Sequence, residues 1–313
     1  MMARVSVLMT VYNGMPHLPA AVESVRTQSL RDFRFVIVND GSTDGTSDYL
    51  ASIRDERLQV IHQHNAGTAA AANAGLAHCH ADFTARLDAD DISLPERLER
   101  QVEFLDQHAD VIMVGTQVRP LGDSGPGHSL HLPTVHDKID TALINNKHGM
   151  AHSSVMVRTS ALKSLGGYWS HQLVDDWDMM LRMAELGCVA NLPEVLLHYR
   201  IHAESQNATT LRHLRFSYDF ACELARRRRS GEPPITPDEF RGALARRPWW
   251  QRAADTMDLY ARTQYRRAQG ELYNGHPWSG RARMLWAACW APRLTWDRIA
   301  RMAASSVTDL RIS

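Results

Sequence analysis

Apolar and polar residues alternate with two different periods along the first half of the chain. Five apolar runs have the length and the β-branched content of strands, and they cover residues 5–11, 33–38, 58–61, 83–87 and 111–118. Between the first two runs, Leu18, Ala21, Val22 and Val25 recur at the spacing of one helical stripe. Strands that alternate with helices over short connections predict an α/β fold, with a mainly parallel sheet flanked by helices.

Capping residues predict where the helices between these strands begin. Thr43 or Ser42 is suited to cap the helix after the second strand. The segment Ser93-Leu94-Pro95-Glu96 has the spacing of a capping box and predicts a helix that runs to about Gln107. An alanine-rich helix is expected over residues 67–78.

The second half of the chain changes character twice. Residues 120–133 are rich in Gly, Ser, Pro and His, and we expect a loop over the site. Residues 137–202 form a second α/β stretch, with a strand at 154–157 and a helix from Asp176 to Leu186. The remainder has helical character. We therefore expect a catalytic domain over residues 1–205 and a helical C-terminal region over 206–313.

Composition limits the classes of protein that fit this chain. The 313 residues are 44% hydrophobic and 22% charged, which is typical of a folded globular protein. Lys and Arg equal Asp and Glu at 35 each, so the overall charge predicts no nucleic-acid partner. The four cysteines are far apart in the sequence, which argues against a disulfide framework or a structural zinc site.

Targeting signals are absent from the sequence. The first residues enter a strand-like run without the apolar core of a signal peptide. No window reaches about 18 consecutive apolar residues, the length of a membrane-spanning helix. We expect a cytoplasmic protein, and attachment to the inner face of the plasma membrane stays open.

Two acids at the end of the fourth strand carry the first chemical signal. Asp88 and Asp90 are separated by Ala89, and residues two apart on a strand share a face. Paired carboxylates of this kind suit a hard divalent cation that leaves places for substrate phosphates. A solvated acidic turn is the alternative interpretation of the same residues.

Polar residues follow three of the expected strands at their carboxyl ends. Residues 10–13 end the first strand, residues 39–42 the second, and residues 88–90 the fourth. In open α/β sheets, ligands bind outside the carboxyl ends of the strands. The sequence therefore predicts one binding site at this edge.

Seven short motifs then carry a resemblance to a known family. They are Val7–Gly14, Val38–Thr46, Asn65-Ala66-Gly67 with Asn73-Ala74-Gly75, Ala85–Asp91, His152-Ser153-Ser154, Asp175–Asp178 with Leu181-Arg182, and Tyr199–His202. In this order, over about 200 residues, the chain resembles a family 2 glycosyltransferase of the inverting type, with the Rossmann-like GT-A fold. The resemblance implies a hexosyltransferase of bacterial polysaccharide biosynthesis, which moves a sugar from a nucleotide donor, a UDP-sugar, to a saccharide or lipid-linked saccharide.

The resemblance also implies a site for the nucleotide sugar. Its residues are Thr10, Tyr12, Asn13, Asp40, Asn65, Gly67, Arg86, Asp88, Ala89, His152 and Asp175. Asp40 is suited to accept a hydrogen bond from a base such as uracil, although it could instead cap a helix. Tyr12 could cover a base or pack in the core. The family often has Arg where this chain has Ala72, and Arg86 either replaces that cation or pairs with an acid.

The metal and the catalytic base are implied in the same way. The family's DXD motif is matched by Asp88 and Asp90, and Asp90 is the stronger candidate ligand for Mn²⁺ or Mg²⁺. Asp88 and His202 are further candidates, and Asp91 fits a helix-entry acid better than a third ligand. Asp176 matches the acid that deprotonates the acceptor hydroxyl, and Asp175 replaces the family's Glu.

Other interpretations remain open at this point. Asp175 and Asp176 could only favour the helix dipole, and Asp178 lies four residues before Arg182, with which it can pair. A sugar-nucleotide pyrophosphorylase would need a Gly-rich basic loop after the first strand, which is missing. A binding protein with a decayed site is the non-enzyme alternative. The C-terminal arginines and tryptophans suit a membrane surface, packing on the core, or a homodimer. The donor sugar, the acceptor and the linkage cannot be predicted from these residues.

Overall fold

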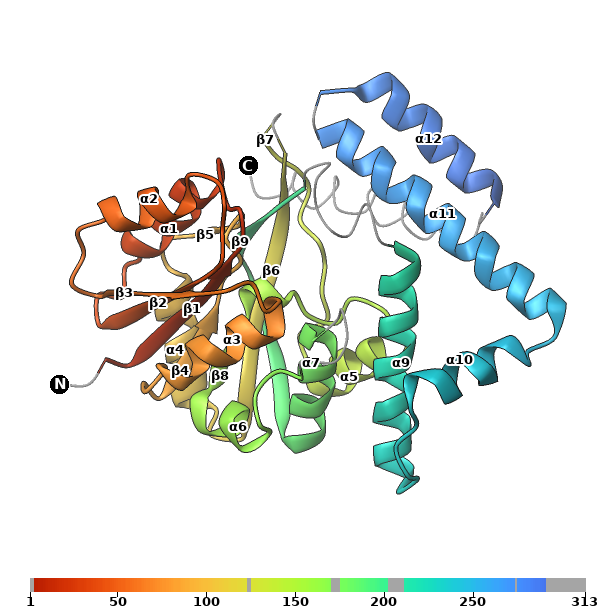
Figure 1. Cartoon of the computed structure of the whole chain (residues 1–313), viewed down its shortest axis with the longest axis horizontal. Helices are drawn as coiled ribbons and strands as arrows, with labels where there is room; N and C mark the ends of the chain where they lie inside the picture. Colours follow the sequence, from red (N-terminus) through yellow and green to blue (C-terminus); the bar gives the residue numbers. More distant parts are fainter. Residues whose placement is uncertain (1–2, 123–124, 170–174, 202–210, 274, 291–313) are drawn as a thin grey trace. The chain divides into compact units, whose positions relative to one another are not determined.

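The computed structural model describes residues 3–122, 125–169, 175–201, 211–273 and 275–290 (Figure 1). The chain divides into two compact units. Met1–Val118 and Leu130–Tyr199 form the first unit, and Arg119–Ser129 and Arg200–Ser313 form the second. The division places a short inner segment with the C-terminal residues, whereas a single boundary near residue 205 was expected.

The first unit contains most of the strands. In chain order its elements are β1 (Val5–Val11), α1 (Leu18–Arg26), β2 (Phe33–Asp40), α2 (Thr46–Ser52), β3 (Leu58–Gln63), α3 (Thr68–Ala77), β4 (Phe83–Arg86), β5 (Ile92–Ser93), α4 (Arg97–Gln107), β6 (Val111–Gly122), α5 (His136–Ile144), the 3₁₀ turn η1 (His152–Ser154), β8 (Met156–Arg158), α6 (Thr159–Ser164), α7 (Asp175–Leu186) and β9 (Cys188–Arg200).

The sheet combines a parallel half with an antiparallel half. Its strand order is β3-β2-β1-β4-β8-β6-β9-β5. The pairs β2–β3, β1–β2 and β1–β4 are parallel, whereas β8 pairs antiparallel with both β4 and β6. The parallel half follows from the helical connections, because a parallel pair needs a crossover between its strands. The expected α/β class is confirmed.

Both faces of the parallel strands are covered by helices. Val5, Val7 and Met9 of β1 pack in one core with the buried stripe of α1, which includes Leu18 and Val22. The opposite face of the strand carries Leu8, and α3 approaches it closely: a side chain at Gly75 would collide with Leu8 and Val38. Alternation along the strand therefore assigns α1 to one face and α3 to the other.

Three local predictions are corrected by the structure. Ser93 belongs to β5 and caps nothing, and α4 begins at Arg97 without a side-chain cap. The helix α2 begins after Gly45, so neither Ser42 nor Thr43 caps it. In the region expected to be a loop, β6 continues to Gly122 and pairs antiparallel with β7 (Gly125–Pro126).

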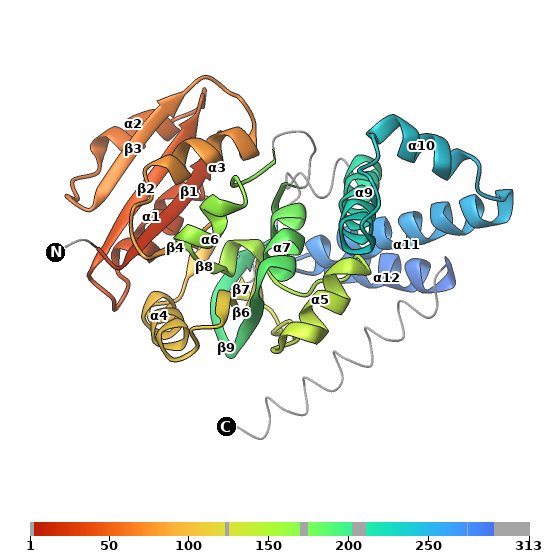
Figure 2. The same ribbon diagram turned by 90° about the horizontal axis from the view of Figure 1, so that it is seen from below.

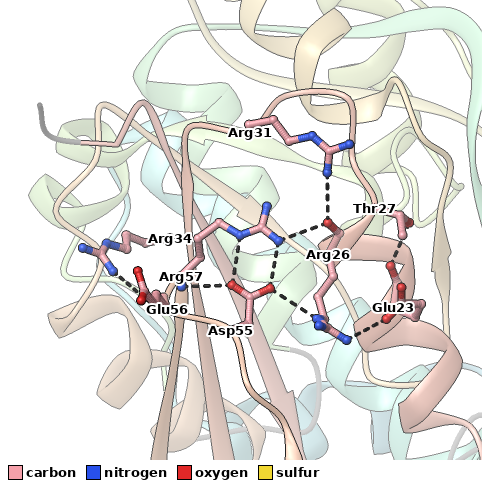
Figure 3. A network of polar contacts seen from close by, with 8 residues as sticks. All are labelled: Glu23, Arg26, Thr27, Arg31, Arg34, Asp55, Glu56 and Arg57. Carbon is pink, nitrogen blue, oxygen red and sulfur yellow. Dashed lines mark hydrogen bonds and ion pairs between the residues drawn. The ribbon is translucent and has the colours of Figure 1, made fainter.

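A polar network stabilises the edge of the parallel sheet that lies opposite the carboxyl edge with the motifs (Figure 3). The carboxylate of Asp55 accepts hydrogen bonds from Nε and Nη2 of Arg57 at 3.0 and 2.8 Å, and from Nε of Arg26 at 3.2 Å. Arg57 also donates to the carbonyl of Arg26 at the end of α1, and its guanidinium lies 4.4 Å from the ring centre of Phe33. The network thus joins α1, β2 and the turn before β3.

The second unit is helical, as expected. Its helices are α9 (Leu211–Ser230), α10 (Pro237–Ala245), α11 (Trp249–Tyr273) and α12 (Pro277–Trp290). The rings of Phe216, Phe220 and Phe240 pack together between α9 and α10. The helices α11 and α12 lie side by side (Figure 1 and Figure 2). Among the described residues, no helix combines the length and the apolarity needed to cross a bilayer.

Candidate active site

The loops after β1 and β2 are tied together at the carboxyl edge of the sheet. Asn13 has a left-handed φ of 51°, and its Oδ1 accepts a hydrogen bond from the backbone N–H of Thr43 at 2.8 Å. The N–H of Asn13 donates to Ser42 Oγ at 2.9 Å. These bonds leave Tyr12 52% exposed, so the core-packing alternative for Tyr12 is excluded. Its ring is available at the rim of this edge.

Asp40 organises the loop before α3. The side chain is buried, and its Oδ1 accepts from Gln63 Nε2 at 2.7 Å and from the N–H of Ala66 at 2.9 Å. Its Oδ2 accepts from the N–H of Gly67 at 3.0 Å. Both oxygens are therefore used by the chain itself, and Asp40 does not cap α2. Contact between Asp40 and a nucleotide base stays a prediction.

Gly67 and Asn65 lie exposed on this loop. Gly67 has φ +87°, which favours glycine, and a side-chain carbon added there would meet no atom within 4 Å. The position opens onto free space, as expected for a backbone that a ligand approaches. Ala72 is buried in α3, so this chain presents no cation from that position.

Arg86 is the buried cation at the centre of the edge. Its side chain is 3% exposed, and Nη2 donates to Thr10 Oγ1 at 2.7 Å and to Asp88 Oδ1 at 3.0 Å. Nη1 donates to the carbonyl of Leu8 at 3.2 Å. Of the two roles left open for Arg86, pairing with an acid is the one that the structure shows. The hydrogen bonds from Arg86 to Thr10 and Leu8 also connect β4 with β1.

Asp88, Ala89 and Asp90 form the half-buried turn that follows β4. The N–H of Asp88 donates to Ser153 Oγ at 3.0 Å, which fixes the turn against η1. Burial raises the pKa of Asp88, Arg86 opposes the rise, and the charge of Asp90 adds to it. The two carboxylates are thus close enough to repel each other, which a shared cation would relieve.

The donor set fits a divalent cation only in part. Two carboxylates with room for water and phosphate ligands suit Mg²⁺ or Mn²⁺. Within the described part of the chain, no group of three or more His, Cys, Asp or Glu residues is arranged to hold a metal. His202, the further candidate ligand, lies outside the described residues.

Arg97 supports the Asp88-Ala89-Asp90 turn from the interior of the protein. It was not among the residues predicted from the sequence. Its side chain is fully buried, and Nη1 donates to the carbonyls of Arg86 at 3.0 Å and of Ser153 at 2.7 Å. Burial lowers the pKa of Arg97 to about 10, and the charge of the buried Asp91 opposes that shift. Asp91 is buried beneath the turn and precedes β5 rather than a helix, so it is not the helix-entry acid that was expected.

Asp175 and Asp176 open α7 and face the same site as Asp88. Burial raises the pKa of Asp176 to about 7, the charges of Asp175 and Asp88 add to the shift, and a hydrogen bond from the N–H of Trp177 at 2.8 Å opposes it. Burial also raises the pKa of Asp175, with Arg86 opposing and Asp88 contributing. Acids almost 90 residues apart in the sequence thus lie within electrostatic reach of each other.

Tyr168 lies within electrostatic reach of these acids, and His152 adjoins it. Nε2 of His152 lies 3.2 Å from the hydroxyl of Tyr168, and the two rings meet edge to face. Burial and the charge of Arg86 lower the pKa of His152 well below 6.5, so the imidazole is neutral. Burial is the main cause of the raised pKa of Tyr168. The sequence reasoning overlooked Tyr168, for which the preceding Gly166-Gly167 pair was the available signal.

Two side chains fix the backbone that presents Tyr168. Asn73 of α3 donates from Nδ2 to the carbonyl of Tyr168 at 2.6 Å and accepts from its N–H at 2.8 Å. From the other side, Arg182 donates to the carbonyls of Leu165 at 2.9 Å and Gly167 at 2.8 Å. The expected pair of Arg182 with Asp178 is confirmed, at 2.7 Å and buried.

Comparison with known proteins now decides the family. The model of glycosyl transferase family 2 matches residues 6–166, just over half of the chain. The chain belongs to glycosyl transferase family 2. The matched region contains the Asp88-Ala89-Asp90 turn and His152, whereas Asp175 and Asp176 follow it. Membership makes the chain a glycosyltransferase by family, as the motifs predicted.

Curated relatives agree with this family. The chain is 33% identical over 226 residues to the putative glycosyltransferase EpsE of Bacillus subtilis. The aligned region covers 70% of this chain and 79% of EpsE. It is 32% identical over 208 residues to the amylovoran biosynthesis glycosyltransferase AmsE of Erwinia amylovora, covering 64% of this chain and 78% of AmsE.

Solved structures share the fold at low sequence identity. Staphylococcus aureus TarS, crystallised with UDP, is 14% identical with a TM-score of 0.58, over 90% of this chain and 87% of the TarS chain. The mannosyltransferase PcManGT of Pyrobaculum calidifontis, in complex with GDP-Man and Mn²⁺, is 18% identical with a TM-score of 0.55, over 98% and 81% of the two chains. The expected glycosyltransferase fold is thereby confirmed.

Proposed function

We propose that this family 2 glycosyltransferase moves a sugar from a nucleoside diphosphate donor to a hydroxyl of a saccharide acceptor, with inversion at the anomeric carbon. The observation that carries the proposal is that Asp88, which follows β4 and pairs with Arg86, lies within electrostatic reach of Asp176 at the start of α7. The pair Asp88 and Asp90 serves the diphosphate side of the donor, and the pair Asp175 and Asp176 serves the acceptor.

Asp176 is suited to take the proton of the acceptor hydroxyl. A general base works best when its pKa is near the operating pH, and the value of about 7 meets this requirement. As the acceptor oxygen bonds to the anomeric carbon, the bond from that carbon to the diphosphate breaks and the proton passes to the carboxylate. The leaving nucleotide departs with the electron pair of the broken bond.

The diphosphate is expected to lie at the Asp88-Ala89-Asp90 turn. Two carboxylates do not bind a diphosphate by themselves, because like charges repel. Mn²⁺ or Mg²⁺ held by Asp90 and Asp88 would neutralise the charge that develops on the leaving group. His202 is a further candidate ligand in this proposal.

The nucleoside is expected to lie over the linked loops that follow β1 and β2. Tyr12 is exposed there and can cover one face of a base, and Asn13, Asn65 and Gly67 surround the same region. Asp40 shapes this pocket through Ala66 and Gly67. UDP is the first candidate nucleotide and GDP the second, since TarS was crystallised with UDP and PcManGT with GDP-Man.

The acceptor is proposed to be a saccharide of a bacterial polysaccharide, free or linked to a lipid. This follows the names of the relatives, which include the amylovoran enzyme AmsE and the O-antigen biosynthesis glycosyltransferase WbnJ of Escherichia coli. A cytoplasmic enzyme would build such a chain on its lipid carrier at the inner face of the plasma membrane.

Release of the nucleotide product tests the proposal directly. UDP- and GDP-sugars should be offered with Mn²⁺, and product nucleotide measured with and without saccharide acceptors. Asp176→Asn should abolish transfer and leave donor binding by calorimetry nearly unchanged. Glu185→Gln, on the exposed part of the same helix, is the matched control and should be fully active. Near-normal turnover of the Asp176 variant would reject its role as base.

A further inference from the structure

The neutral overall charge of the chain conceals two strongly charged parts. Residues 200–313 contain 20 arginines, no lysine and 11 acidic residues, which gives a net charge of +9. Residues 1–199 contain 15 basic and 24 acidic residues, which gives −9. The basic part favours an anionic partner, and guanidinium groups bind phosphates in a bidentate manner.

The helices α11 and α12 of this basic part pack through small residues. Ala261, Ala268, Gly280 and Ala287 are buried between them. A side-chain carbon at Gly280 would come within 2.7 Å of Leu272, so glycine is needed for the close approach. Because small residues fill the contact between α11 and α12, the large apolar residues of α12 lie outside that contact.

Those large residues lie on the outside. Trp278, Ala282 and Leu285 are spaced by four and three residues and share one line of α12, with Trp286 beside them. We call these four residues the outer face of α12. Trp278 is 80% exposed, Leu285 71% and Trp286 52%. An apolar stripe normally faces a protein core, whereas this one is exposed.

Neighbouring residues of α11 extend the same surface. The indole N–H of Trp286 donates to the hydroxyl of Tyr260 at 3.2 Å, so the exposed Tyr260 adjoins the outer face of α12. The exposed Arg281 lies beside one of these aromatic residues, with its guanidinium 5.6 Å from the ring centre of Trp278. Amphipathic rings next to cations are typical of helices that lie in a membrane interface.

We propose that the outer face of α12 binds the surface of an anionic bilayer. Trp278, Leu285 and Trp286 would lie at the boundary between headgroups and acyl chains, and Arg281 would contact lipid phosphates. Charge complementarity selects this partner: a basic part with exposed apolar residues matches a surface that is both anionic and apolar. Binding in the plane of the membrane also agrees with the absence of a spanning helix among the described residues.

This inference deepens the proposed function without depending on it. An enzyme held at a bilayer meets acceptors that are carried on lipids, which narrows the proposed acceptor to the lipid-linked class. Membrane binding itself needs no sugar, nucleotide or metal. A failure of the binding experiment would therefore leave the transferase assay unaffected, and the reverse also holds.

Flotation of the full-length protein with vesicles tests the proposal. We expect binding to vesicles that contain phosphatidylglycerol, and little binding to vesicles of phosphatidylcholine alone. The double variant Trp278→Ala with Leu285→Ala should lower the partition coefficient about tenfold or more. Acyl chains carrying bromine should quench tryptophan emission of the wild type, and quench it less in the variant.

A matched control removes exposed apolar area from the first unit. Val135 and Leu186 are 52% and 49% exposed, and the double variant Val135→Ala with Leu186→Ala should bind vesicles as the wild type does. Circular dichroism should show equal helix content in all three proteins. Equal binding to both vesicle types, or no binding to either, would overturn the proposal. A dimer in light scattering that the Trp278 and Leu285 variant abolishes would instead assign the face to a second copy, and binding of RNA in preference to vesicles would assign it to nucleic acid.

Discussion

Asp88 at the carboxyl edge of the sheet lies within electrostatic reach of three further carboxylates and of the buried Arg86. Asp88, Asp90, Asp175 and Asp176 contribute four formal negative charges, and Arg86 contributes one positive charge. Burial is the main reason why Asp88, Asp175 and Asp176 bind protons at higher pH than usual, and the excess negative charge adds to this effect. This charge also favours the binding of a cation and the uptake of a proton from the substrate. These are the two events in the proposed reaction.

The pKa of Asp176 sets the pH dependence that we expect for activity. With a pKa of about 7, the carboxylate is protonated and inactive as a base below that value and becomes available above it. We predict that kcat/KM rises between about pH 6 and pH 8 and then levels off. Nucleotide release measured across this range checks the prediction, and a flat profile would contradict it.

The same shift predicts that Asp176 lowers stability at neutral pH. Below about pH 4 the acid is protonated in both the folded and the unfolded state, and between about 4 and 7 only the unfolded state loses its proton. Folding is therefore penalised as the pH rises. We expect Asp176→Asn to be more stable than the wild type by about 1 kcal/mol at pH 8. The gain is small because the side chain is only partly buried and solvent screens its charge. Urea denaturation at pH 8 and pH 4 checks this, and the difference should vanish at pH 4.

At the scale of elements, the site depends on side chains of three helices that hold two separate turns. Asn73 on α3 and Arg182 on α7 hold the Gly166–Tyr168 turn, and Arg97 on α4 holds the turn after β4. The geometry of the proposed site is thus supported by side chains outside the residues assigned to substrate or metal. Substitutions at these supporting residues should change stability and activity together.

The two adjacent glycines offer a matched pair of variants. Gly166 and Gly167 have φ of +75° and +72°, so alanine costs roughly 1 kcal/mol of backbone strain at either. Only Gly167→Ala would also collide with Oδ1 of Asn73. We predict that Gly167→Ala loses about 2 kcal/mol more stability than Gly166→Ala and most of the activity. Thermal denaturation and nucleotide release compare them, and equal losses would contradict the role of Asn73.

The Asp55 network predicts a second effect at the scale of elements, far from the site (Figure 3). Hydrogen bonds from Arg57 lower the pKa of Asp55, so its stabilising effect is present above the unfolded pKa of about 3.9 and is lost as the pH falls below it. Asp55→Asn should cost about 2 kcal/mol at pH 7 and progressively less in acid. Chemical denaturation measures this, with the exposed neighbour Glu56→Gln as the control. An equal cost at pH 7 and pH 3 would contradict the linkage.

At the scale of the whole molecule, we propose that the two units, each with its own core, carry separate tasks. The first unit buries its core between the parallel strands and their helices, and the second packs around Phe216, Phe220 and Phe240. Donor binding is assigned to the first unit, and the aromatic arginine-rich surface belongs to the second. Each can therefore be tested without impairing the other.

Removal of the metal should weaken donor binding by the whole protein. We predict that UDP raises Tm more with Mn²⁺ than with a chelator, because the cation offsets repulsion between the diphosphate and the acids. Asp90→Asn should abolish the Mn²⁺-dependent part of the shift. Asp48→Asn, an exposed acid on α2, should retain it. Identical shifts with Mn²⁺ and with chelator would argue against a metal at this turn.

Local signals predicted much of the sheet and of its functional edge. The observed β1 begins and ends where the apolar run predicts, and the four stripe residues of α1 are all buried. Capping predictions at Ser93 and Thr43 were wrong, because tertiary contacts gave these residues other environments. Helix starts depend on a few side-chain hydrogen bonds, which packing readily overrides.

The sequence by itself determined the positions of the four parallel strands, the acids at their ends and the family, because periodicity and short motifs are properties of neighbouring residues. It did not predict β5, β7 or β9. Only the tertiary structure decided the antiparallel half of the sheet, the partners of Asp40 and the place of Tyr168. Asn73 and Tyr168 bond across 95 residues of sequence, and no local pattern records such a pair. The proton affinity of Asp176 is likewise a property of burial and of charges brought together by folding.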